Sequence, residues 1–276
     1  MRNRIIRAEN YKIRRNLTVR IAILVVICAV IAGCALFYGA MHIISGELIE
    51  AAGGYATDKD AFDDINLFDC GGIVLSFAQL LLILFAVVLT ILISAEKKNG
   101  VYSLMLSRGY TSGQIYAAKV YETVVVSAIL YLACAVVSLV TGAIFWHGEI
   151  EREDITGFIR IFFLLLFMYL ASALILSAIA LNVKNAATAI AVNLLLIIVF
   201  SSVITGVDQA LFDGGAVLRK YWIFSAIEQF AYIDYTETTV RETILGIGEA
   251  VLYGGIASAA GYFAFAGKKR ERTLHD

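Results

Sequence analysis

Residues that commonly carry catalytic or metal chemistry are few in this sequence and widely separated. The three histidines, His42, His147 and His275, lie far apart along the chain. None belongs to the His-Glu-x-x-His spacing that puts two zinc-binding imidazoles on one helix face. No histidine falls within a predicted membrane span, where a membrane-embedded serine protease would need its general base. We therefore expect this chain to be neither an enzyme nor a metal protein.

Loops that bind phosphate or calcium are also missing. The segment most similar to a phosphate-binding loop is GYFAFAGKK at 261–269. It has one residue too many between its two glycines, and it has lysine where the loop needs serine or threonine. The acidic stretch at 58–69 lacks the glycine and the final glutamate of a calcium loop. We interpret the first as the basic end of a membrane span and the second as a solvated acidic surface, so no cofactor is expected on this chain.

Composition predicts an all-α polytopic membrane protein. The 276 residues are 60% hydrophobic and 16% charged, with a mean hydropathy of +0.81, far from the values of a soluble domain. Crossing a hydrocarbon core takes about 20 helical residues, and six stretches are that long or nearly so. These are 19–41, 73–95, 120–146, 157–182, 187–204 and 244–267. We expect one permease domain over 1–276, with a basic segment at 1–18, spans one and two within 19–95, spans three to six within 120–267, and a tail at 268–276.

Charge asymmetry predicts the orientation. With six spans, 16 of the 22 lysines and arginines fall on the side of both termini, and 17 of the 23 acidic residues fall on the other side. Loops that stay in the cytoplasm retain lysine and arginine. We therefore expect a multi-pass protein of a bacterial plasma membrane with both termini in the cytoplasm.

Polar groups within the predicted spans are sparse. Glu122 and Arg160 lie near span ends, where we expect them to reach the interface, and Glu249 lies a few residues inside the outer end of the last span. Gln79 and Asn193 are the deeper polar groups. Hydrogen bonding between helices is the favoured interpretation for these two residues, and contact with a transported molecule is the alternative.

Three further segments leave alternatives open. The basic segment at 1–18 is either an interfacial amphipathic helix, favoured here, or a disordered basic tail. The apolar patch in the outer loop at 205–243 is either a re-entrant or interfacial helix between spans five and six or a soluble amphipathic cap. Small residues recurring every fourth position at 246–258 predict close helix contact, within the bundle or across a dimer.

A polar segment at 96–119 separates the second and third spans and is the most informative part of the chain. Its apolar residues recur at helical spacing, which predicts a folded amphipathic element in place of a simple connection. They are Val101, Leu104, Ile115 and Ala118, with Tyr102 and Met105 alongside.

This segment resembles the corresponding part of ABC-2-type transporter permeases, such as the small six-span exporters of peptides and drugs. In that family an acidic residue is followed by a glycine, a leucine-rich helix, a Ser-Arg pair, an apolar residue and a lysine opening the third span. The matching residues are Glu96, Gly100, Leu104, Ser107, Arg108, Ile115 and Lys119. The chain departs from the family where Gly109-Tyr110-Thr111 stands in place of a frequent proline.

The resemblance implies that 96–119 docks as a coupling helix on a separate ABC ATPase, which would bind ATP and Mg²⁺. It also implies a second permease copy or paralogue, and outward movement of an amphipathic peptide, antibiotic or lipid. The lipid bilayer is a further partner, and no nucleic acid is expected. Reversing the charges of Arg108 and Lys119 together should weaken ATPase association. The alternative is a secondary carrier or a membrane scaffold with no ATPase, for which Glu249 is the candidate charge.

Overall fold

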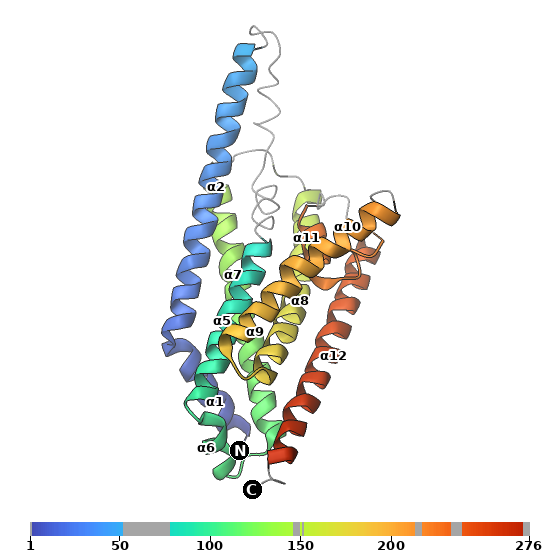
Figure 1. Cartoon of the computed structure of the whole chain (residues 1–276). Helices are drawn as coiled ribbons and strands as arrows, with labels where there is room; N and C mark the ends of the chain where they lie inside the picture. Colours follow the sequence, from blue (N-terminus) through green and yellow to red (C-terminus); the bar gives the residue numbers. More distant parts are fainter. Residues whose placement is uncertain are drawn as a thin grey trace.

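The computed structural model is a bundle of long helices with its termini at one end (Figure 1). It describes residues 2–51, 78–145, 150, 152–212, 217–232 and 239–272, and within them no strand occurs. The helices are α1 (Arg2–Arg15), α2 (Leu17–Ala51), α5 (Ala78–Lys98), α6 (Val101–Ser107), α7 (Ser112–Phe145), α8 (Arg152–Asn182), α9 (Ala186–Leu194), the π-helix η1 (Leu195–Phe200), α10 (Ser201–Leu211), α11 (Ile223–Tyr232) and α12 (Val240–Arg272). The all-α prediction is confirmed.

Within the residues that the structure describes, six helical stretches are long and apolar enough to cross a membrane, as the sequence predicts. They are Leu17–Ala40, Gln79–Lys98, Ser112–Phe145, Arg152–Asn182, Ala186–Leu211 and Val240–Gly267. The boundaries differ most for the third span, whose helix begins at Ser112 and not near 120. The prediction was wrong there because the first turns of α7 are polar, and hydropathy alone assigns polar turns to a loop.

The α8 helix lies at the centre of the bundle and packs against α5, α7 and α12. Three glycines of α12 allow its close approach to α8. A Cβ at Gly246 would lie 2.6 Å from Leu164 Cδ1, one at Gly254 would lie 3.6 Å from Ala171 Cα, and one at Gly261 would lie 2.9 Å from Ala178 Cβ. The small face of the last span is therefore used within the bundle and not left open for a dimer.

The fifth span is a continuous helix with a π segment in its middle, running through α9, η1 and α10. After it, Asp208 accepts hydrogen bonds from the backbone N–H groups of Leu218 at 2.9 Å and Arg219 at 2.8 Å, which fixes the connection to α11. The short helix α11 buries Phe224 and Ile227 and packs against α8 and α5. A helix between spans five and six is common to both alternatives, the re-entrant or interfacial helix and the amphipathic cap, and the structure shows that its apolar side packs on the bundle.

The basic N-terminal segment forms α1, so the disordered alternative does not hold for residues 2–15. The chain bends at Asn16, whose side chain accepts a hydrogen bond from the Thr18 N–H at 2.9 Å and begins α2. The α1 helix buries Ile13 and Glu9 and packs against α7. Of the other predictions, the acidic stretch at 58–69 and the residues His147 and His275 lie outside the described part of the chain.

Candidate functional site

The α6 helix is a separate element bounded by two turns that need glycine. Gly100 precedes it with φ 66° and Gly109 follows it with φ 85°, both in the left-handed region that glycine adopts without strain. The Gly109 N–H donates to Leu106 O at 2.9 Å and the Tyr110 N–H donates to Met105 O at 3.1 Å, the paired bonds of a Schellman motif. The segment predicted as one coupling element is therefore three pieces: the end of α5, the two-turn helix α6 and the start of α7.

The start of α7 is defined by a reciprocal cap. The Thr111 N–H donates to Gln114 Oε1 at 3.1 Å, and the Gln114 N–H donates to Thr111 Oγ1 at 3.3 Å. This is a capping box with glutamine at its third helical position, and the Thr-x-x-Gln spacing is visible in the sequence. It was the missed signal for where the third span begins.

One side of α6 faces outward and the other is anchored in the bundle. Ser103, Leu104, Ser107 and Arg108 are exposed, and the Leu104 side chain is 51% exposed. On the inner side Tyr102 is buried and its ring meets Phe265 of α12 edge-on, with centroids 6.1 Å apart. The outward residues form a continuous surface on a short, well-held helix, which can bind another protein without rearranging.

A second anchor joins α5 to α8 beside α6. The Lys97 ammonium donates to the backbone carbonyls of Ala180 at 2.6 Å and Val183 at 2.9 Å. Carbonyls at a helix C-terminus carry partial negative charge, so a cation stabilises them. Around these contacts Ile115 and Tyr116 of α7 are buried together with Leu181 and Ala189. Movement of α6 would therefore displace the adjoining ends of α5, α7, α8 and α12.

A buried network of ion pairs lies at the same end of the bundle and joins α1, α5 and α7. Lys119 Nζ lies 2.9 Å from Glu9 Oε1, 2.5 Å from Glu96 Oε2 and 2.8 Å from Glu122 Oε2. Lys12 Nζ lies 3.3 Å from Glu9 Oε2 and 2.6 Å from Glu122 Oε1, and it also contacts Glu96. The Lys119 side chain is 1% exposed. Three carboxylates and two ammonium groups give the ion-pair network a formal charge of −1.

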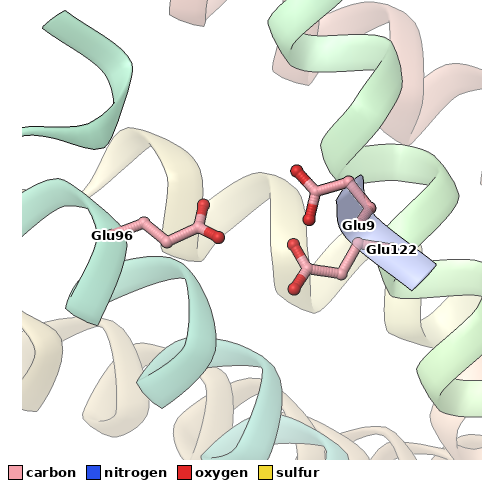
Figure 2. A group of neighbouring side chains, drawn as sticks. All are labelled: Glu9, Glu96 and Glu122. Atoms are coloured by element: carbon pink, nitrogen blue, oxygen red, sulfur yellow. The ribbon is translucent and has the colours of Figure 1, made fainter. Parts of the chain in front are cut away.

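The three carboxylates of this network face a common space, with Glu96 opposite Glu9 and Glu122 (Figure 2). One oxygen from each lies within 4.8 Å of the others, close enough to ligate one cation. The ammonium groups of Lys12 and Lys119 already contact all three carboxylates. The space that a cation would need is therefore shared by two lysines, and the arrangement serves to bind three helices together.

The seven residues predicted for ATPase docking divide into two groups. The structure brings Leu104, Ser107 and Arg108 to the exposed surface of α6, and Gly100 to the turn before it. The remaining three, Glu96, Ile115 and Lys119, are buried, at 6%, 0% and 1% exposure.

Lys119 was predicted to act with Arg108 in ATPase association, but the structure does not bring their charges to one surface, because the Lys119 ammonium is enclosed by carboxylates. Glu122 was expected to reach the interface. It is 4% exposed instead, held by the two lysines.

The two predicted pathway residues both make hydrogen bonds between helices. The buried Asn193 amide donates to Thr90 Oγ1 at 3.2 Å and to Leu176 O at 3.3 Å, joining the fifth span to α5 and α8. Gln79 is exposed at the opposite end of the bundle from α6, and its amide donates to Glu228 Oε1 of α11 at 3.0 Å. The favoured interpretation, bonding between helices, describes both residues. The expectation that Gln79 lies deep in a span is wrong, because Gln79 is the second residue of α5 and is exposed.

Sequence reasoning missed Glu9 and Lys12 as parts of the site. Glu9 and Lys12 are three residues apart, and so are Lys119 and Glu122. The two residues of each pair therefore lie on the same face of their helix. That spacing is the one available signal, and it is also common on solvated helix surfaces. Only the packing of α1 and α5 against α7 shows that the two pairs combine.

Comparison with known proteins gives one result that bears on this site. A family model described as ABC-2 family transporter protein matches residues 5–201. This range contains α1 from Ile5 onward, α6, the ion-pair network, the first four spans, and the fifth span up to the end of η1. No curated protein matches the sequence. With more than half of its residues matched and six membrane-spanning helices, the chain is a multi-pass membrane protein that belongs to the ABC-2 transporter family.

Proposed function

We propose that the chain is the membrane-spanning permease subunit of an ATP-driven ABC exporter, and that α6 is where a separate ATPase subunit docks. The observation that carries this proposal is the outward face of α6, defined by Ser103, Leu104, Ser107 and Arg108 and called here the docking surface. A half-exposed leucine beside an arginine offers an apolar contact and a charge-assisted hydrogen bond.

The anchoring of α6 supports a role in transmitting motion. The inner side of α6 contacts α12 through Tyr102 and Phe265, and Lys97 ties the end of α5 to the end of α8. Close-packed protein interiors have low compressibility, so they transmit a displacement from one helix to its neighbours. A force on the docking surface would therefore tilt several spans together. In the proposed mechanism, closure of the nucleotide-bound ATPase exerts this force and so drives transport.

The apolar surfaces that the spans expose bear on the transported molecule and on the assembly. An amphipathic peptide, antibiotic or lipid moving outward fits the apolar surfaces that the spans expose, since the fifth span is only 17% buried and the last span 22%. Such weakly buried helices fit a pairing with a second permease copy or paralogue, with the transport path between them. ATP and Mg²⁺ would be bound by the ATPase subunits, and both termini of this chain would lie in the cytoplasm.

Isolation of the protein from its native membrane in mild detergent, followed by mass spectrometry, tests the proposal. We expect a stoichiometric ABC ATPase in the purified complex. Arg108→Glu should reduce the recovered ATPase at least about tenfold. The new carboxylate would face the acidic group of the ATPase that Arg108 is proposed to bind, and two like charges facing each other across an interface cost several kcal/mol. Lys184→Glu, which makes the same charge change at an exposed residue outside α6, is the matched control and should retain the ATPase. Recovery of the permease alone in all samples, with the detergent shown not to strip known subunits, would contradict the proposal.

A further inference from the structure

Three exposed arginines lie together at the bend between α1 and α2 (Figure 1). Arg14 and Arg15 are the last residues of α1, and Arg20 lies in the first turn of α2. Arg20 fixes their arrangement, because its Nε and Nη2 donate to the Arg14 carbonyl at 3.2 and 3.0 Å. A carbonyl at a helix C-terminus carries partial negative charge, which favours this contact. The fold therefore holds these three residues, called here the arginine cluster, at one place on the surface.

The guanidinium groups of the arginine cluster keep donors for a further ligand. Arg20 gives Nε and one of its two terminal nitrogens to the Arg14 carbonyl. Arg15 lies over the Tyr11 ring, with its Cζ 4.9 Å from the ring centroid. Stacking on a ring uses the face of a guanidinium and leaves the N–H groups at its edge available. Within the described part of the chain, no carboxylate forms an ion pair with any of the three arginines.

The acidic residues at this end of α1 do not neutralise the arginine cluster. Glu9, Glu96 and Glu122 are buried, and two lysines hold them in the ion-pair network with a formal charge of −1. The arginine cluster contributes +3 at the surface, so positive charge remains in excess. An anion with several oxygen acceptors, such as a phosphate group, matches the fork of N–H donors that a guanidinium presents.

An apolar face of α2 begins beside the arginine cluster and continues along the first span. Leu17, Ile21 and Leu24 lie four and three residues apart, and each side chain is more than half exposed. Arg20 shares this face, three residues after Leu17 and four before Leu24. Because the first span begins at Leu17, the three apolar side chains face the hydrocarbon, and Arg20 extends its charge along its methylene stem to the headgroup layer. A ligand that fits both parts has an anionic group at one end and a hydrocarbon chain at the other.

We propose that the bend between α1 and α2 binds one anionic phospholipid, with its phosphate on the arginine cluster and an acyl chain along Leu17, Ile21 and Leu24. A soluble phosphate would contact the arginines alone and would leave the apolar face without a ligand. The bound lipid would hold the first span, which is only 22% buried within the bundle, at a fixed depth in the membrane. This binding needs no ATPase and no cargo, so the inference goes beyond the proposed function and is tested separately from it.

Native mass spectrometry of the full-length chain, purified in detergent and titrated with lipid, tests the proposal. The probe is phosphatidylglycerol, and the comparison is phosphatidylcholine with the same acyl chains, whose phosphate charge is balanced within its own headgroup. We expect one phosphatidylglycerol to bind at least about tenfold more tightly than phosphatidylcholine, because a basic residue near an anionic headgroup strengthens binding about fivefold. Glycerophosphoglycerol, which is the same headgroup without acyl chains, should not displace the bound lipid at an equal concentration.

A pair of double variants locates the site. Arg14→Gln combined with Arg15→Gln should weaken phosphatidylglycerol binding about 25-fold, and it keeps Arg20, which holds the bend. Lys98→Gln combined with Lys184→Gln removes two exposed charges from the same end of the bundle and should leave lipid binding unchanged.

Three results would overturn the proposal. Equal binding of the two lipids would show that the bend does not recognise the anionic headgroup. Equal effects of the arginine and lysine double variants would show that binding depends on total charge and not on the arginine cluster. Displacement of the lipid by glycerophosphoglycerol at an equal concentration would show a site for soluble anions, in which the apolar face of α2 takes no part.

Discussion

Replacing Lys119 with methionine should be among the most destabilising single changes in the described part of the chain. The wild-type ion-pair network holds three carboxylates and two ammonium groups, a formal charge of −1. Lys119→Met makes that charge −2 and leaves three buried carboxylates to share the half-exposed Lys12. Removing one partner of a buried ion pair costs about 3–5 kcal/mol. For a protein of this size that corresponds to a fall in Tm of about 6–20 °C.

The buried cysteines provide the assay. Cys34 and Cys134 are 0% and 8% exposed, so a thiol-reactive dye that fluoresces on coupling reports their exposure as the detergent-purified protein unfolds. Cys28 is exposed in the first span, and Cys70 lies outside the described residues, so the signal before heating is measured with Cys28→Ala and Cys70→Ala variants as the baseline. The matched control is Lys119→Met combined with Glu122→Gln, which restores a formal charge of −1 and should recover at least half of the lost Tm. A single variant as stable as the wild type, or a double variant no better than the single, would refute the electrostatic account.

Two glycine positions test the local backbone and packing geometry, and Glu249 tests the carrier alternative. Gly261→Ala should lower the free energy of unfolding by about 1–3 kcal/mol, because the new Cβ would overlap the Tyr116 hydroxyl, whereas Gly255→Ala on an open face of the same helix should be neutral in the same melting assay. Gly109→Ala should cost about 1–2 kcal/mol because φ 85° is strained for alanine, and Gly109→Asn should cost less; an equal loss for both would count against backbone strain. Glu249→Gln should have little effect on transport by the complex, and complete loss of transport would favour a carrier mechanism or a role of Glu249 in gating.

Hydropathy predicted the fold well because membrane spans are defined by a property of single segments. Six long apolar stretches need no knowledge of their neighbours, and wherever the structure describes them, all six coincide with helices. The errors lie at the ends. The first helix continues through Ala51, about 52 Å for its 35 residues, beyond the apolar stretch that predicted it. The third helix begins two turns before its apolar stretch because Thr111 and Gln114 cap it there.

The candidate site was predicted in part, and the division has a physical cause. Leu104 and Arg108 follow from the order of residues in one short segment, and the structure places both on one surface. Whether Lys119 faces water or carboxylates depends on where α1 and α5 pack, and these helices supply Glu9 and Glu96 from distant parts of the sequence. A lysine three residues before a glutamate looks the same in both situations, so no local pattern separates them.

Photo-crosslinking from the docking surface shows directly whether an ATPase binds α6. A photoreactive amino acid at Leu104, 51% exposed, would be activated in native membranes and its adducts identified by mass spectrometry, with Leu24 in the first span, 62% exposed, as the control. We expect Leu104 to capture an ABC ATPase and Leu24 to capture none. Capture of the ATPase from both positions, or from neither while the complex is intact, would contradict docking at α6.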